Sequence, residues 1–142
     1  MVDMILWENY KKICFIAPFL APQWPVYAIV TAWNPASREV GMRRNTRRQR
    51  ALWRAIAASP TMMALGPLWG SAPDASWRES SLALVSSRGE AIDLAARFGQ
   101  NAIYWVEQGE LWLQPVLMKG EPLHLGKNRI PLDCQVNGLM KE

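Results

Sequence analysis

Val26-Tyr27-Ala28-Ile29-Val30-Thr31-Ala32-Trp33 is an almost unbroken apolar run, rich in β-branched and aromatic residues. This composition predicts a strand that is covered on both faces. Pro25 and the corner Asn34-Pro35 limit the run. A strand that ends in a polar corner and feeds a helix is a common place for a ligand site, because the helix N-terminus presents unpaired N–H groups. A plain turn accounts for the same corner equally well.

A long helix is expected after the corner, ending at Ser59-Pro60 because the residue before a proline avoids helical geometry. Two stripes with helical spacing run along it. The stripe predicted to be buried consists of Met42, Asn45, Thr46, Gln49, Leu52, Trp53 and Ile56. The second stripe, on another face, consists of Arg43, Arg47, Arg50 and Arg54.

The rest of the chain alternates between short helices and pairs of strands. Ser87 and Glu90 form the pattern of a capping box, and Gly99 is suited to end the helix that they open. Helices are expected over 4–12 (capped by Asp3) and 88–98, strands over 13–16, 79–85, 102–106 and 111–116, an edge strand or irregular run over 62–69, and short edge strands at 123–125 and 130–132. This order predicts an α+β fold, with 1–142 as a single domain and a mixed β-sheet with three helices packed on it. Residues 118–142 form a weakly patterned C-terminal segment.

The positive charge of the chain is local. The net charge is +4, but residues 38–54 hold seven arginines and one glutamate, and the remainder is net acidic. Such a patch is suited to phosphate or to an acidic protein partner. A solvated helix face has the same composition, so both interpretations stay open.

The sequence lacks the residues that several classes of function require. Cys14 and Cys134 are far apart, and His124 is the only histidine, so no metal site, zinc centre or histidine-based triad is expected. No phosphate-binding loop, dinucleotide fingerprint or other cofactor motif occurs. The N-terminus does not have the pattern of a signal peptide, and no run is long enough to span a bilayer. We expect a cytosolic protein with no cofactor and no membrane partner.

Three motifs carry a family resemblance. They are Thr31-Ala32-Trp33-Asn34-Pro35 with Ser37 and Asn45, then Pro73-Asp74 with Trp77-Arg78-Glu79-Ser80, and lastly Phe98-Gly99-Gln100-Asn101-Ala102. In order and spacing they resemble a bacterial family of uncharacterised proteins, domain of unknown function 3293, within a family-like core over residues 25–117. The sequence departs from the family at Arg44, where an acidic residue often stands. The resemblance implies no established activity.

The motifs are expected to meet at one end of the sheet. Strand 79–85, helix 88–98 and strand 102–106 form a β-α-β unit, so Glu79 and Gln100 both lie at strand starts. If the central strand runs antiparallel to these two, its last residue, Asn34, lies at the same end. We predict that Asn34, Glu79 and Gln100 converge as a ligand-binding cluster, with Asn45 or Trp77 nearby. The alternative is that the amides only tie loops to strand ends.

Three functions are compatible with these residues. The first is a small protein-binding adaptor, regulator or immunity-type protein that uses Arg43, Arg47, Arg50 and Arg54 against an acidic partner. The second is a nucleic-acid or nucleotide binder, in which the arginines hold phosphates and Trp33 or Trp53 stack on bases. The third is a small enzyme with Glu79 as acid or base, which requires a pocket and a raised pKa. The first is the favoured prediction, so a non-enzymatic role is expected, with no residue assigned to catalysis.

Overall fold

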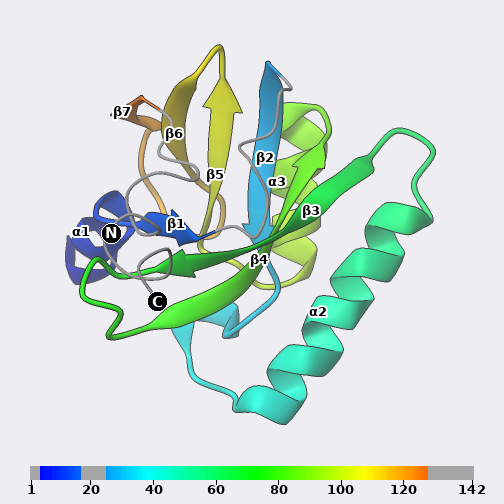
Figure 1. Cartoon of the computed structure of the whole chain (residues 1–142), viewed down its shortest axis with the longest axis horizontal. Helices are drawn as coiled ribbons and strands as arrows, with labels where there is room; N and C mark the ends of the chain where they lie inside the picture. Colours follow the sequence, from blue (N-terminus) through cyan, green and yellow to red (C-terminus); the bar gives the residue numbers. More distant parts are fainter. Residues whose placement is uncertain (1–3, 17–24, 128–142) are drawn as a thin grey trace.

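Strand β2 (Val26–Thr31) lies in the middle of the sheet in the computed structural model, which describes residues 4–16 and 25–127 (Figure 1). The remaining strands are β1 (Cys14–Ile16), β3 (Met63–Ser71), β4 (Arg78–Val85), β5 (Ala102–Glu107), β6 (Glu110–Pro115) and β7 (Leu123–Lys127). The helices are α1 (Met4–Lys11), α2 (Met42–Ala57), α3 (Arg88–Arg97) and the short 3₁₀ helix η1 (Pro35–Ser37). Asp3 and the strand expected at 130–132 lie outside the described residues.

The described strands form one sheet in the order β1-β3-β4-β2-β5-β6-β7. The predicted α+β fold, with helices packed on a sheet, is confirmed. Each pairing is antiparallel, whereas a mixed sheet was expected. The reason is that β2 lies between the two strands of the β-α-β unit. Strands β4 and β5 run parallel to each other, and each pairs with β2 in the antiparallel sense.

Strand β3 occupies an interior position, whereas an edge strand or irregular run was expected there. It pairs with β4 on one side and with β1 on the other. Its register shifts between Ala64 and Gly66, immediately before Pro67. Proline cannot donate a ladder hydrogen bond and is tolerated in sheets next to such irregularities. The Gly66-Pro67 pair therefore interrupts the register without ending the strand.

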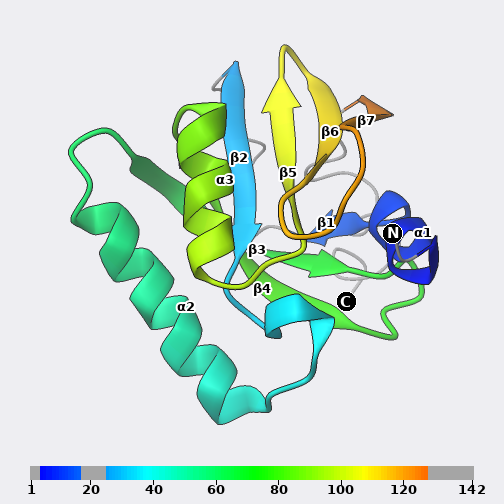
Figure 2. The same ribbon diagram turned by 180° about the vertical axis from the view of Figure 1, so that it is seen from behind.

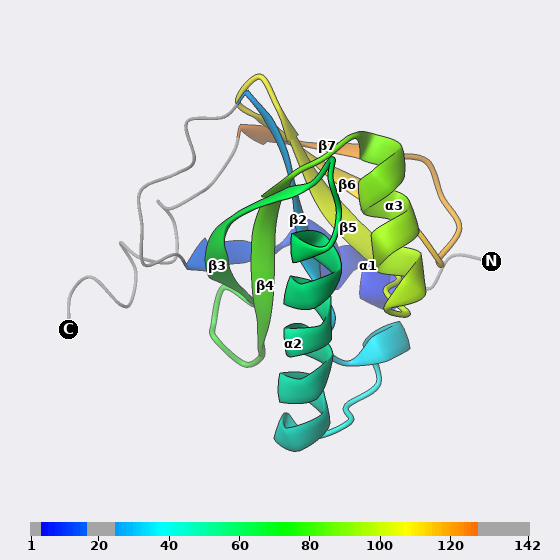
Figure 3. The same cartoon turned by 90° about the vertical axis from the view of Figure 1, so that its right-hand side faces the viewer.

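Both faces of the sheet are buried. Strands β3 and β4 cross at a steep angle to β2, β5 and β6, so the sheet curls around an inner face (Figure 1). The inner core contains Ile13, Phe15, Tyr27, Ile29, Leu68, Ala83, Tyr104, Val106, Leu111 and Leu113. Helices α2 and α3 cover the outer face (Figures 2 and 3), and the outer core includes Ala28, Val30, Leu52, Ile56, Leu82, Leu84 and Leu94. The alternation along β2 between these two cores confirms that this strand is covered on both sides.

Helix α2 buries a narrower stripe than expected. Its buried residues are Asn45, Gln49, Leu52 and Ile56. Met42 and Trp53 were assigned to this stripe, but their exposed fractions are 64% and 39%. Trp53 falls to one flank of the line formed by the buried residues, which are spaced by 4, 3 and 4. Met42 continues that spacing, but it is the first residue of the helix and lies before the buried stretch, which begins at Asn45.

Candidate functional site

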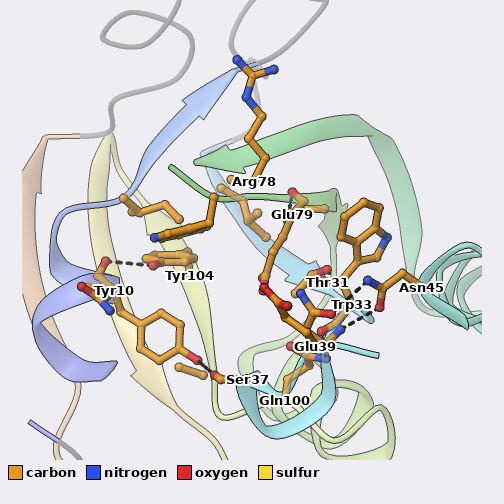
Figure 4. A pocket seen from close by; sticks show the side chains of 18 of the residues that line it. Tyr10, Thr31, Trp33, Ser37, Glu39, Asn45, Arg78, Glu79, Gln100 and Tyr104 are labelled. Atoms are coloured by element: carbon orange, nitrogen blue, oxygen red, sulfur yellow. Dashed lines mark hydrogen bonds between the residues drawn. The ribbon is translucent and has the colours of Figure 1, made fainter. Parts of the chain in front are cut away.

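A pocket of about 460 Å³ opens on the inner face of the sheet, where β2 ends and β4 and β5 begin (Figure 4). Its volume is in the range of small-molecule sites. The five residues predicted to form a cluster, Asn34, Asn45, Trp77, Glu79 and Gln100, all line it. Residues that were not predicted to belong to the site complete the wall, and these include Tyr10, Thr31, Ser37, Glu39, Gly70, Ser81 and Tyr104.

The corner after β2 has an unusual backbone. Asn34, Ala36 and Ser37 have φ values of 44°, 55° and 62°, in the left-handed region that non-glycine residues rarely adopt. The backbone N–H of Ala36 donates to the carbonyl of Gly99, 2.7 Å away. The corner is thus held from outside by the segment that follows α3.

Two of the predicted site amides hold this corner in place. Gln100 donates from Nε2 to the carbonyl of Trp33 at 3.0 Å. Asn45 accepts from the backbone N–H of Asn34 at 2.9 Å and donates to Oδ1 of Asn34 at 3.0 Å. These bonds satisfy buried polar groups, so Asn45 and Gln100 build the pocket wall and have little capacity left for a ligand.

Arg48 also holds the corner after β2 in place, and this role was not predicted from the sequence. Its Nε donates to the carbonyl of Ala32 at 2.7 Å, and its second terminal nitrogen donates to the carbonyl of Phe98. The arginine run around it concealed this role. Its spacing from Asn45, however, places it on the flank of the buried stripe, and that spacing could have separated it from the exposed arginines.

Glu79, unlike the site amides of Asn45 and Gln100, is an ionisable residue. Burial raises its pKa to about 7, and a hydrogen bond from the side chain of Asn34 opposes this rise. No ion pair of Glu79 occurs within residues 4–16 and 25–127. The neighbouring guanidinium of Arg78 points away from the carboxyl (Figure 4). On β3 the residue opposite Glu79 is Gly70, where a Cβ would lie 3.2 Å from Cδ1 of Ile13, so the wall of the pocket is closely packed at this point.

Aromatic side chains form much of the remaining wall. The hydroxyl of Tyr104 donates to the carbonyl of Tyr10 at 2.8 Å, and the hydroxyl of Tyr10 shares a hydrogen bond of 2.8 Å with Oγ of Ser37 (Figure 4). These bonds occupy the hydroxyls and fix the rings. Trp33 is 8% exposed, and its indole N–H has no hydrogen-bond partner in the part of the chain that the structure describes. The wall thus contains one buried donor without an acceptor.

The family model described as "Protein of unknown function (DUF3293)" matches residues 30–103. The chain belongs to this family. Neither the curated proteins nor the solved structures that were searched gave a match.

The DUF3293 match covers only part of the pocket. Asn34, Glu79 and Gln100 fall inside the matched range, whereas Tyr10 and Tyr104 fall outside it. The resemblance expected from the three motifs is confirmed, and those motifs build the polar half of the pocket. The match assigns no activity to them.

The four arginines Arg43, Arg47, Arg50 and Arg54 lie on the exposed face of α2, away from the pocket floor. No salt bridge involving them occurs among the residues whose positions are given. That same part of the chain contains no group of three or more potential metal-binding side chains, and none of its helices has the length and apolar character needed to cross a membrane.

Proposed function

We propose that this protein binds a small polar molecule in the pocket and that Glu79 contacts the ligand and exchanges a proton with it. The observation that carries the proposal is the position of Glu79, whose largely buried carboxyl lines a cavity without a cationic partner. Burying a carboxyl in this way costs stability. A structural role does not require that cost, because a glutamine or an apolar residue would fill the same position.

A pKa near 7 also suits acid–base chemistry, because a group then supplies and accepts a proton at the pH of the cell. This supports the enzyme hypothesis that the sequence left open, with Glu79 as the acid or base. Its support is that Glu79 lines the pocket and that burial raises the pKa of its carboxyl. The reaction itself requires a substrate to be identified.

The test is a search for small molecules that stay bound to the purified protein. Native mass spectrometry and ligand-observed NMR with a metabolite mixture would compare wild type with Glu79→Gln. Glu107→Gln, an exposed glutamate at the other end of β5, is the matched control. We expect ligands that bind wild type and Glu107→Gln but not Glu79→Gln. Ligands that bind all three proteins equally would remove Glu79 from the site.

A second candidate function is docking of an acidic protein on α2. Its support is that Arg43, Arg47, Arg50 and Arg54 are exposed and lack ion pairs among the described residues, and that Trp53 on the neighbouring flank is 39% exposed. Arginine and tryptophan are enriched in the energetic centres of interfaces. This arrangement also fits the hypothesis of a protein-binding role that the sequence favoured. A reducing, cytosolic compartment suits a chain that has only two, widely separated cysteines.

Affinity purification tests this second candidate. The triple variant Arg43, Arg47, Arg50→Ala is compared with Arg97, Lys119, Lys127→Ala, which removes the same charge from exposed positions elsewhere. We expect an acidic protein to be retained by wild type and by the control variant only. Retention of nucleic acid that is lost at moderate salt would favour the nucleic-acid hypothesis instead.

A further inference from the structure

We propose that the pocket is selective for a small organic cation with N–H donors, such as a primary amine, held between the carboxyl of Glu79 and aromatic rings. This inference rests on the proposed function of the pocket and adds the chemical class of the ligand. The acceptors, the charges and the rings of the wall all favour such a ligand.

The hydrogen-bond acceptors of the wall are available to a ligand. The NH₂ group of Gln100 and both ends of the Asn45 amide are used within the protein, whereas no hydrogen bond to Oε1 of Gln100 occurs among the described residues. Oδ1 of Asn34 accepts from Asn45 and from the backbone N–H of Val40, at 3.0 and 3.3 Å. The carboxyl of Glu79 has only the Asn34 amide beside it. A ligand that reaches the ionised carboxyl of Glu79 must therefore donate hydrogen bonds to it.

The charges around this carboxyl favour a cation. The charged or titratable side chains that line the pocket with Glu79 are Glu39, Arg78, Tyr10 and Tyr104. Of these, Arg78 and Glu39 are both exposed, and the guanidinium of Arg78 is directed away from the carboxyl (Figure 4). A bound cation would replace the missing partner of Glu79, whereas a bound anion would face the carboxylate of Glu79. Like charges at close range disfavour binding.

The rings supply the second half of a cation site. Tyr10, Tyr104, Trp33 and Trp77 line the pocket from α1, from β5, and from the segments after β2 and before β4. Cations are attracted to the faces of such rings, most strongly where water is excluded. The hydroxyls of both tyrosines are engaged within the protein, so their rings are held in position before a ligand arrives.

Binding of a cation beside Glu79 should depend on pH. With its pKa at about 7, Glu79 is ionised in only about half of the molecules at neutral pH. A cation binds the ionised form, so binding should release protons. The apparent affinity should fall about tenfold between pH 8 and pH 6, following the ionised fraction. An alkylammonium keeps its own charge over this range.

The test uses three probes of similar size, benzylammonium, benzyl alcohol and benzoate, in NMR titrations of the full chain. The indole N–H resonances of Trp33 and Trp77 report on the pocket. We expect benzylammonium to bind with a roughly millimolar dissociation constant, as suits a ligand of this size, and about tenfold more tightly than the other probes. Glu79→Gln should remove this preference and its pH dependence, and Glu107→Gln should keep both.

Gly70→Val locates the binding. Gly70 lines the pocket opposite Glu79, and a Cβ there would lie 3.2 Å from Cδ1 of Ile13, another lining residue. The larger side chain must displace Ile13 within the wall, so it should weaken binding of benzylammonium. Equal or tighter binding of benzyl alcohol or benzoate at the same resonances would overturn the cation proposal and leave the proposed pocket function standing. Absence of binding by all three probes would overturn both. The pH dependence of wild type decides the question even if a variant fails to fold.

Discussion

Asn34 and Asn45 exchange two hydrogen bonds across 11 residues of sequence. Oδ1 of Asn45 accepts from the backbone N–H of Asn34 at 2.9 Å, and Nδ2 of Asn45 donates to Oδ1 of Asn34 at 3.0 Å. The pair joins the first turns of α2 to the left-handed corner after β2. Because Oδ1 of Asn34 accepts the bond from Nδ2 of Asn45, the NH₂ group of Asn34 is directed to the carboxyl of Glu79, which it stabilises in the ionised form.

The first prediction concerns this pair. Asn45 is 4% exposed, and Asn45→Ala leaves the buried N–H of Asn34 without its acceptor. We expect a loss of about 2 kcal/mol in the free energy of unfolding, the usual cost of an unsatisfied buried polar group. Urea denaturation measures this loss, and Arg44→Ala, at the exposed neighbouring position, is the control. Equal losses in the two variants would show that the pair does not hold the corner.

The second prediction is a pH dependence of stability. The pKa of Glu79 is raised from 4.5 to about 7 in the folded protein, so the folded state binds more protons than the unfolded state between these values. Glu79 therefore lowers stability as the pH rises from about 4.5 to 7. The loss amounts to about 3 kcal/mol, because each pKa unit corresponds to about 1.4 kcal/mol.

Glu79→Gln isolates this contribution from the other carboxyls. The variant should gain stability relative to wild type as the pH rises through this window, and the difference should be constant above about pH 8. Urea denaturation of both proteins at several pH values measures it. Parallel stability curves for the two proteins would mean that the carboxyl of Glu79 titrates as an exposed group.

Much of the backbone followed from local patterns. The almost unbroken apolar run of β2, the capping box of Ser87 and Glu90 at α3, and Gly99 at its end are all visible in the sequence and all present in the structure. The convergence of Asn34, Glu79 and Gln100 followed from strand direction, because β4 and β5 run parallel to each other and β2 runs antiparallel to both. Whether these residues bind a ligand stays a prediction.

The contributions from distant segments could not be found in this way. Tyr10 reaches the pocket because β1 pairs with the outer edge of β3, which brings the end of α1 to the inner face. No local pattern encodes that pairing. The predicted burial of Trp53 was wrong for a different reason. Its apolar character suggested burial, but the narrow contact of α2 with the sheet leaves its side chain 39% exposed. Burial at the flank of a helix depends on what packs against it.

The third prediction separates two adjacent arginines of α2. Arg48 donates to the carbonyls of Ala32 and Phe98, whereas Arg47 belongs to the exposed stripe of the helix. Arg48→Ala should cost about 2–3 kcal/mol, because partly buried carbonyls lose a charged donor, and Arg47→Ala should change stability by less than about 0.5 kcal/mol. Thermal and urea denaturation of the two variants give the comparison. Similar effects would mean that Arg48 does not join α2 to the corner in solution.

The fourth prediction compares two glycines with positive φ. Gly99 and Gly109 have φ values of 71° and 79°, so alanine is strained at either position. A Cβ at Gly99 would also lie 3.0 Å from Cβ of Pro35, whereas at Gly109 it would meet nothing within 4 Å. Gly109→Ala should therefore cost about 1 kcal/mol and Gly99→Ala about 2–3 kcal/mol, because the second variant must also push the corner away from the segment after α3. Urea denaturation measures both losses. In Gly99→Ala the displaced corner should also shift the indole resonance of Trp33, and an unchanged resonance with equal losses would show that Gly99 contributes only its backbone conformation.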